Sequence, residues 1–262
     1  MKTLIYQVYT GKRKNLYDFC TESVKKYAER IGSDYIVQRQ PILMIRPDPF
    51  NQGRSNESYM KYGGFLPIYE KENAFGYFHQ YDKIAIIDGD IYIRPTAPNL
   101  FDQIDDNHDF AGVIERQMPL NDKYQAKITN YSRMQYGTIK SVDWKWNYLG
   151  AEFFNMGMML MNKSIYKYFN GQTPKEFLSR PRFKNFIDGV GPWKWSTDQT
   201  LLNTWVREEK MRLKHLDWKW NGLYNAVPND LLKQAHFIHF FHKTVLPMEG
   251  ENIEELAKLV GI

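Results

Sequence analysis

The 262-residue chain lacks the features that define several common protein classes. Its single cysteine, Cys20, excludes an internal disulfide framework and a zinc site built from several cysteines. No apolar run approaches the roughly 18 residues that a transmembrane helix needs, and residues 1–10 are too polar for a signal peptide. No Gly- or Ser-rich linker divides the chain. We therefore expect one compact cytoplasmic unit without an integral membrane segment.

The charge balance is also modest. The formal net charge is +5, from 35 basic and 30 acidic side chains. This excess suits an anionic ligand, but the basic residues are dispersed and no nucleic-acid recognition motif is present, so we expect no nucleic-acid partner. Aromatic residues are abundant, with 7 Trp, 18 Tyr and 16 Phe. Such residues fill cores, and they also form platforms for sugar rings.

The order of the expected elements favours an α/β fold. Residues 2–9 alternate like a strand, residues 15–30 carry apolar side chains at helical spacing, and residues 34–37 form a second short strand. This order predicts a βαβ unit. Residues 41–58, rich in Pro, Asn, Gly and Arg, are expected to be a mobile loop, and a helix is expected to begin within residues 59–69.

Residues 83–87 are the most definite strand. The run Lys-Ile-Ala-Ile-Ile is apolar without alternation, which is typical of a central strand that is buried on both faces. Further strands are expected at 91–93, 109–115, 153–161, 212–216 and 235–240, and further helices at 164–169, after 173–176, after 196–199 and at 251–260. Strands that alternate with helices in this way predict an α/β domain.

Two aspartates follow the central strand, Asp88 and Asp90, with Gly89 between them. Open α/β sheets bind ligands at the carboxyl ends of their strands. In extended chain the two carboxylates project to the same side, where both stay ionised only if a cation lies between them. Mg²⁺ and Mn²⁺ bind carboxylate and phosphate oxygens together, and Gly89 would leave space for a ligand. The alternative is a turn with two solvated aspartates.

Three histidines, His236, His239 and His242, lie in a segment rich in Phe. The Phe and Ile pattern favours a strand, in which the three side chains would not converge. A histidine in an apolar run is usually a core residue, unless a metal beside carboxylates needs a nitrogen ligand. Because Asp90 and His239 are 149 residues apart, sequence spacing does not decide between these alternatives.

Two further motifs are ambiguous by themselves. Residues 155–162 form a Met-rich core strand in which Gly157 indicates a bulge or the close approach of a ligand. Asp198 and Gln199 follow Thr197 at an expected helix start, where they either cap the helix or hydrogen-bond sugar hydroxyls.

The tripeptide Trp-Lys-Trp occurs three times, at 144–146, 193–195 and 218–220. The unequal spacing excludes a regular repeat. In a strand, each Trp pair would project from one face. Sugar binding and core packing both remain open.

These motifs, in this order, resemble those of the GT-A-fold nucleotide-sugar glycosyltransferases, most closely glycosyltransferase family 8, which includes glycogenin and bacterial galactosyltransferases. The matching segments are 81–90, 154–162, 198–203, 216–221 and 238–240. The sequence departs from the family pattern at His242, where the family has glycine, and at Lys243, which comes two positions before the family's lysine.

The resemblance implies a GT-A-like domain over residues 1–262, with a Rossmann-like nucleotide-sugar-binding half at 1–100, an acceptor-binding half at 101–262 and a mixed central sheet. It implies Mn²⁺ or Mg²⁺ ligated by Asp88, Asp90 and His239. Asp198 and Gln199 would be catalytic residues beside the anomeric carbon. The expected donor-binding residues are Tyr9, Thr10, Gly11, Lys61, Asp88, Gly89, Asn155 and Lys243, and the expected acceptor platforms are Trp195, Trp218 and Trp220.

The expected activity is metal-dependent transfer of a sugar from a nucleotide-sugar, by resemblance UDP-linked, to a hydroxyl of a glycan or glycolipid, with retention of configuration. One alternative is a non-catalytic sugar-binding module on the same scaffold, against which the intact acids and His239 argue. Another is a haloacid-dehalogenase-like phosphatase. That class has its Asp-x-Asp near the N-terminus followed by Gly-Thr, whereas here Ile91 and Tyr92 follow Asp90.

Overall fold

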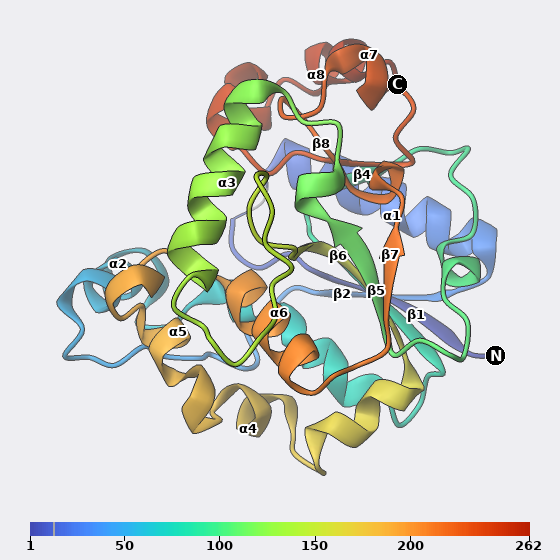
Figure 1. Ribbon diagram of the computed structural model, residues 1–262. Helices are drawn as coiled ribbons and strands as arrows, with labels where there is room; N and C mark the ends of the chain where they lie inside the picture. Colours follow the sequence, from blue (N-terminus) through green and yellow to red (C-terminus); the bar gives the residue numbers. More distant parts are fainter. Residues whose placement is uncertain (13) are drawn as a thin grey trace.

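A six-stranded mixed sheet forms the centre of the computed structural model, which describes residues 1–12 and 14–262, without the side chains of residues 52, 53 and 55 (Figure 1). Its strands are β1 (Thr3–Val8), β2 (Asp34–Gln38), β3 (Lys83–Ile87), β5 (Phe110–Ile114), β6 (Phe154–Asn162) and β7 (Leu213–Leu216), in the order β2-β1-β3-β6-β5-β7. β1 is parallel to β2 and β3, and β7 is parallel to β5. β6 is antiparallel to both β3 and β5. The expected α/β architecture with a mixed central sheet is confirmed.

A small second sheet consists of β4 (Ile91–Ile93), β8 (Gly222–Leu223) and β9 (Phe237–His239), in the order β4-β9-β8. The chain leaves the central sheet at Asp88 and enters this second sheet at Ile91. β4 is antiparallel to β9, and the register places Ile91 opposite His239. This pairing joins the first hundred residues to the end of the chain.

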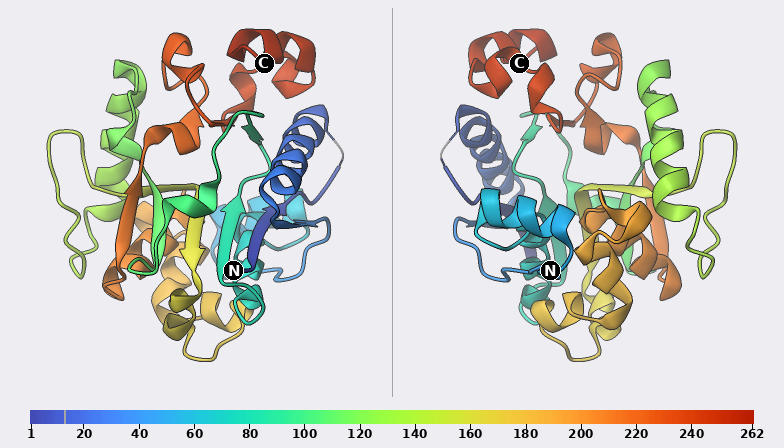
Figure 2. Two further views of the ribbon diagram at one scale, coloured as in Figure 1. Left: turned by 90° about the vertical axis from the view of Figure 1, so that its right-hand side faces the viewer. Right: turned by 90° about the vertical axis from the view of Figure 1, so that its left-hand side faces the viewer.

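Helices cover both faces of the central sheet. They are α1 (Asn15–Ile31), α2 (Gln52–Tyr62), α3 (Asp122–Tyr136), α4 (Pro174–Leu178), α5 (Lys184–Asp188), α6 (Asp198–Glu208), α7 (Asn229–Leu232) and α8 (Ile253–Val260). Figure 2 shows α1 and α3 on opposite flanks of the sheet, with the C-terminal helices at one end. Among the described residues, no helix combines the length and apolar character needed to cross a bilayer.

The central strand β3 is buried along its whole length, as expected. Ile84 and Ile86 pack into a cluster with residues of α6, whereas Ala85 and Ile87 pack on the other face with residues of α1. Each large aliphatic side chain that is fully buried in this way stabilises the fold by about 1.5–3 kcal/mol. The sheet is therefore a rigid platform, and the segments that follow its strands are held in fixed positions.

The segment between β2 and β3 differs from the expectation. α2 begins at Gln52, inside the expected loop, and ends at Tyr62, so the expected helix within 59–69 is wrong. Gly63, with φ of 69°, ends the helix in the left-handed conformation that glycine favours. Arg54 anchors α2 by donating to the carbonyls of Phe186 and Ser196, so a long-range contact, not an apolar stripe, positions this helix.

α3 was not predicted. Its sequence is largely polar, and its buried residues include only a few apolar side chains, among them Ile128 and Tyr136. These pack against Trp144 and Phe153, which lie in a separate small core beside the central sheet. The helix becomes recognisable only when its partners are known.

Candidate active site

Asp88 and Asp90 lie where β3 ends. The backbone N–H of Asp88 donates to the carbonyl of Gly157 in β6 at 2.8 Å, and the chain then turns towards β4. Gly89 is needed for packing within the protein. A Cβ at this position would lie 2.9 Å from the carbonyl oxygen of Val8 and 3.2 Å from the ring of Tyr17. The space that we expected a ligand to use is therefore occupied by the protein itself.

His239 joins the two aspartates because β9 pairs with β4. Its Nε2 lies 3.3 Å from Asp90 Oδ1 and 3.8 Å from Asp88 Oδ2. One ligand atom from each of the three residues lies within 4.8 Å of the others. The other two histidines lie elsewhere, as expected for a strand. His236 packs on Trp220, and the exposed His242 side chain contacts Thr244.

The orientation of His239 fits a metal ligand. Its Nδ1 lies 3.1 Å from Asn221 Oδ1, and the Asn221 amide donates to Asn155 Oδ1 at 2.8 Å. Because Asn221 presents its oxygen, Nδ1 carries the proton and Nε2 offers a lone pair towards the aspartates. Two carboxylates and one imidazole form a donor set that suits a divalent cation.

Gly157 allows this arrangement. The β5–β6 register is irregular between Gly112 and Val113, so β6 bulges there, and the bulge expected at Gly157 is confirmed. A Cβ at residue 157 would lie 2.6 Å from His239 Nδ1, closer than van der Waals contact permits. Glycine is thus required for the imidazole to approach β6.

The two carboxylates near His239 favour a positive charge between them. Burial by itself disfavours the imidazolium, but the hydrogen bond with Asp90 and the charges of Asp90 and Asp88 outweigh it and raise the pKa of His239. A bound cation would satisfy the same two carboxylates.

Lys71 is the central cation of the site, and sequence reasoning missed it. Its ammonium donates to Asp88 Oδ1 at 2.8 Å and to the carbonyl of Met156 at 2.7 Å, and it forms an ion pair of 2.9 Å with Asp198 Oδ2. Only 9% of its side chain is exposed. Burial by itself would lower the pKa of Lys71, but Asp198 and Asp88 outweigh burial and raise it. The residue lies in the polar run 69–73, which is typical of an exposed segment, so no signal in the sequence distinguished it.

Asp198 is the first residue of α6 and lies almost wholly out of solvent. Burial is the main cause that raises the pKa of Asp198 to about 6, Lys71 opposes the rise, and Asp88 adds to it. The carboxylate is therefore poised to change charge near neutral pH. Gln199 lies beside it and accepts from the backbone N–H of Met156 at 3.2 Å.

Glu115 forms a second acidic group in the same region. It directly follows β5 and is 2% exposed. Tyr124 and the amide of Asn155 donate to its two oxygens at 3.0 Å each. Burial is the first cause of the raised pKa of Glu115. Its position at the end of the expected strand at 109–115 was a sequence signal that could have identified Glu115 as a site residue.

These residues line one cleft of about 370 Å³. Its wall includes Tyr124 and Tyr131 from α3 and the polar residues described above, which are Lys71, Asp88, Asp90, Glu115, Asn155, Asp198, Gln199 and His239. Both polar atoms of the Asn155 amide already form hydrogen bonds within the protein, so they cannot both be fully available to a sugar donor. The cleft brings together Asp88, Asp90 and His239 and both expected catalytic residues.

The remaining expected donor residues lie outside the cleft wall. Tyr9 is 5% exposed, stacks on Tyr17 and shares its hydroxyl with the backbone of Lys14. Thr10 and Gly11 continue from β1 without contributing to the cleft. Lys61 lies on the exposed side of α2, 3.1 Å from Glu57.

Lys243 is close to the cluster without lining the cleft. Its ammonium contacts the hydroxyl of Tyr17 and lies 4.2 Å from the centre of that ring. Tyr17 in turn packs against Gly89. Burial, with a smaller effect of Lys14, lowers the pKa of Lys243.

The Trp-Lys-Trp segments are not strands, so each pair separates. Trp144 is buried whereas Trp146 is 45% exposed, and Trp195 is 61% exposed. Trp220 is 4% exposed and packs edge-on against Phe237, which leaves no platform for a sugar. Trp218 packs partly against the same core. None of the three expected acceptor platforms lines the cleft, and Trp195 alone of them presents a largely open ring.

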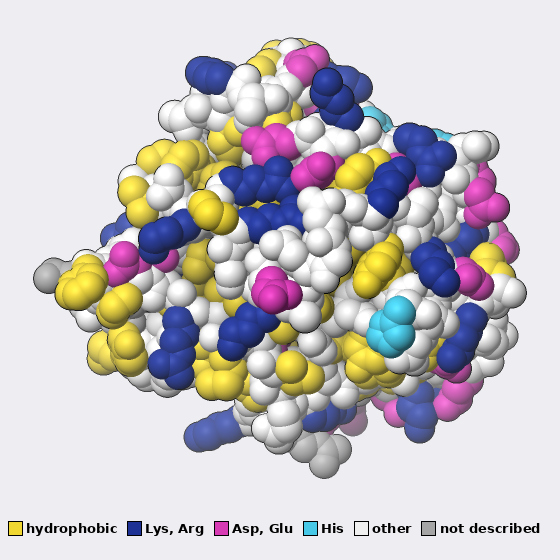
Figure 3. Space-filling model, turned by 90° about the horizontal axis from the view of Figure 1, so that it is seen from below, with side chains coloured by type: hydrophobic (Ala, Val, Ile, Leu, Met, Phe, Trp, Pro, Cys, Tyr) yellow, Lys and Arg dark blue, Asp and Glu magenta, His cyan; other side chains and the backbone are white. Residues whose placement is uncertain are grey.

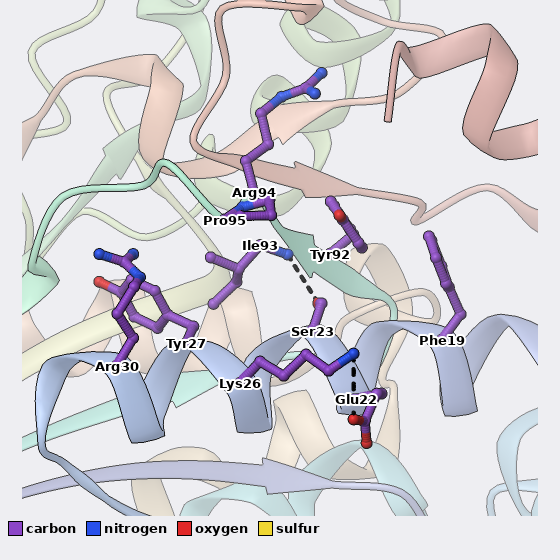
Figure 4. A pocket seen from close by; sticks show the side chains of 10 residues that line it. All are labelled: Phe19, Glu22, Ser23, Lys26, Tyr27, Arg30, Tyr92, Ile93, Arg94 and Pro95. Carbon is purple, nitrogen blue, oxygen red and sulfur yellow. Dashed lines mark hydrogen bonds and ion pairs between the residues drawn. The ribbon is translucent and has the colours of Figure 1, made fainter.

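A second cavity, of about 330 Å³, lies between α1 and β4 (Figure 4). Several of its polar groups already have partners within the protein. Lys26 lies 3.5 Å from Glu22, and the hydroxyl of Ser23 accepts from the backbone N–H of Ile93 at 3.0 Å. The cavity lacks the converging acids and the buried cation that distinguish the cleft.

Glu72, next to Lys71, is a buried acid with no hydrogen-bond partner for either oxygen among the described residues. Burial, reinforced by the charge of Asp198, raises the pKa of Glu72 well above its ordinary value, although Lys71 opposes this. The folded protein therefore keeps a proton on Glu72 that the unfolded chain releases above about pH 4.3.

This difference predicts that Glu72 reduces stability as the pH rises. Glu72→Gln has no such proton to lose, so its free energy of unfolding should exceed that of the wild type by a margin that grows with pH, by up to about 1.4 kcal/mol per unit between pH 5 and 7. Urea unfolding at pH 5, 6 and 7 measures the margin, with the exposed Glu254→Gln as the control. A margin that does not change with pH would show that Glu72 is ionised in the folded protein.

The fold defined by these elements is the GT-A fold of glycosyltransferases. Neither the family models nor the curated proteins that were searched match the sequence. Solved structures do match. A glycosyltransferase involved in the glycosylation of the major capsid of PBCV-1 superposes with a TM-score of 0.56 at 15% identity, over 97% of this chain and 100% of that one.

The galactosyltransferase LgtC, in complex with donor and acceptor sugar analogues, superposes with a TM-score of 0.56 at 12% identity, over 98% of this chain and 95% of that one. The bifunctional glycosyltransferase WbbM superposes at 0.51 with 14% identity, over 98% of this chain and 50% of that one. At such low identity the likeness establishes the fold alone. It confirms the GT-A fold that the motifs implied.

Proposed function

We propose that the protein is a metal-dependent glycosyltransferase that transfers a sugar from a nucleotide-sugar, UDP-linked by resemblance, to a hydroxyl of a glycan or glycolipid. The observation that supports this most strongly is the convergence of Asp88, Asp90 and His239 on one point, next to Lys71 and Asp198, in a cleft of a GT-A fold. The solved structures described above, which superpose on this chain, are glycosyltransferases, so a GT-A fold can carry out glycosyl transfer.

The chemistry follows from the charge of the leaving group. Breaking the glycosyl bond releases a nucleoside diphosphate, so negative charge grows on the oxygen that departs, and positive charge fixed nearby lowers the barrier. A divalent cation, Mn²⁺ in our proposal because one ligand is an imidazole, would supply most of that charge when bound to Asp88, Asp90 and His239. Lys71 adds a permanent positive charge on the same side of the cleft.

In this proposal the donor's nucleotide lies against residues 1–100 and the acceptor against residues 101–262. Asp198 and Gln199 face the donor sugar from the start of α6, and the reaction proceeds with retention. Tyr124 and Tyr131 replace the Trp residues as the acceptor wall, because they line the cleft and Trp218 and Trp220 do not. Glu115 lies on the same side and can accept a hydrogen bond from an acceptor hydroxyl.

The test is metal-dependent turnover of a panel of nucleotide-sugars, with Mn²⁺ and with EDTA. We expect release of a nucleoside diphosphate with Mn²⁺, and a loss of at least about 100-fold with EDTA, because the charge that stabilises the leaving group is removed. Addition of Mn²⁺ in excess should restore the rate. Release of inorganic phosphate from sugar phosphates would support the phosphatase instead, and glycan binding with no turnover on any donor would support a non-catalytic module.

A further inference from the structure

Large exposed hydrophobic side chains gather around α2. Phe50, just before α2, and Met60, in the last turn of α2, are 89% and 87% exposed. The group, which we call the α2 face, consists of Ile42, Met44, Phe50, Tyr59, Met60 and Trp195. Figure 3 shows hydrophobic side chains at the end of the lower surface where Figure 1 places α2, with Lys and Arg side chains beside them.

The protein is built to present these side chains. The buried carboxylate of Glu70 accepts from the backbone N–H groups of Ile42, Leu43 and Met44 at 2.7, 3.0 and 2.7 Å. Met44 has φ of 48°, a left-handed conformation that is costly for a non-glycine residue. The anchor therefore fixes the segment in a conformation that leaves Ile42 and Met44 exposed.

α2 is anchored in the same way beside Trp195. Arg54 donates to the carbonyl of Ser196, the residue after Trp195, and the Asn51 side chain donates to the carbonyl of Asp188. These contacts join the two segments of the α2 face, although they are about 140 residues apart in sequence.

A basic cavity of about 540 Å³ opens next to Met44. Arg46, Lys175, Arg180 and Lys184 line it, together with one acid, Asp188. Lys184 lies 2.6 Å from Asp188. Among the described residues, Arg46 and Lys175 have no carboxylate within ion-pair distance, so the cavity has an excess of positive charge.

We propose that the α2 face docks on an anionic phospholipid bilayer, with a lipid phosphate in the basic cavity and Phe50 and Met60 between the headgroups and the acyl chains. Apolar and aromatic side chains beside Lys and Arg are the combination that binds such an interface. A second copy of this chain fits less well, because two cavities with excess positive charge would approach each other.

The position of the α2 face deepens the proposed function, on which this step rests. Trp195, which belongs to the α2 face, lies two residues before Thr197, which lines the cleft. A bilayer bound to the α2 face would therefore lie next to the cleft, and the acceptor it brings there would be a lipid-linked glycan. A soluble glycan would gain nothing from this docking.

The docking test needs no turnover. The full chain is floated with vesicles of 30% phosphatidylglycerol in phosphatidylcholine, and with vesicles of phosphatidylcholine alone. We expect binding to the anionic vesicles that weakens at high salt, a loss of at least tenfold in Phe50→Asp/Met60→Asp, and a similar loss in Arg46→Glu/Lys175→Glu. The matched control is Tyr148→Asp/Met248→Asp, which changes two side chains that are 84% and 73% exposed elsewhere on the surface and should bind like the wild type.

Three results would overturn the proposal. The first is no binding of the wild type to anionic vesicles, or an equal loss in the control. The second is a dimer in solution that Phe50→Asp/Met60→Asp separates, which would assign the face to a second copy. The third is release from vesicles by millimolar inorganic phosphate, which would assign the cavity to a free anion. Vesicle binding without transferase activity would support the docking surface and contradict the proposed function.

Discussion

Replacing Lys71 by methionine should reduce both stability and activity more than any other single change outside the three proposed metal ligands. The substitution leaves Asp88 and Asp198 without the buried cation that lies 2.8 and 2.9 Å from them. Removing one partner of a buried ion pair typically costs about 3–5 kcal/mol. The penalty should be smaller at pH 5 than at pH 8, because Asp198, whose pKa already lies near 6, can then be neutralised by a proton.

The same change should lower kcat by about 10²–10³-fold, the usual effect of removing one fixed donor from a site where negative charge develops. Lys83→Met is the matched control. Lys83, the first residue of β3, is also a buried lysine, but it donates to the carbonyls of Phe101 and Ile104 at 3.1 and 2.7 Å, and among the described residues it forms no ion pair with a carboxylate. It should lose stability and keep kcat. Equal loss of kcat in both variants would show that Lys71 acts only through folding.

Asp90→Asn should abolish tight binding of Mn²⁺. Outer partners of a metal ligand alone change affinity by about 10–100-fold, so loss of a ligating carboxylate should exceed about 100-fold. Isothermal titration with Mn²⁺ alone, at pH 7.5, measures the affinity without any sugar donor. Nucleoside diphosphate release should fall in parallel, since the cation is what the acid contributes to the reaction.

Asn221→Ala provides a graded comparison for Asp90→Asn. Asn221 orients His239 through Nδ1 and donates its amide to Asn155 Oδ1, so we expect a 10–100-fold loss of Mn²⁺ affinity. The exposed Asp106→Asn should bind like the wild type. If Asp90→Asn binds Mn²⁺ as tightly as Asp106→Asn, the three-residue cluster is not the metal site.

The elements that could be predicted from sequence are those with strong local signals. The buried run 83–87 predicted a central strand, and residues 173–176 predicted a helix, where the structure has α4 with a capping box between Thr173 and Glu176. α3 and α2 were missed or misplaced because most of their residues are polar and their anchors, such as Arg54, contact segments far away in sequence. Periodicity carries no information about such contacts.

The candidate site divides in the same way. Asp88, Asp90, Asp198 and Gln199 could be named because each follows a strand or begins a helix. Lys71 could not, since a polar run looks the same whether it faces solvent or the inside of a cleft. Tyr9 and Trp220 were expected to bind ligands, but their rings pack within the protein. Only the structure shows this, because just 5% of Tyr9 and 4% of Trp220 is exposed.

The sequence by itself determined the strand that ends in two aspartates and the helix that starts at Asp198, because each depends on neighbours along the chain. Tertiary structure decided which distant groups meet. Strand pairing between β4 and β9 brings His239 to Asp90 across 149 residues, and the packing beneath the cleft turns Lys71 from an apparent surface lysine into a buried cation. The residue type determines whether a side chain can carry a charge, but burial, which only the fold determines, sets its pKa and its reactivity.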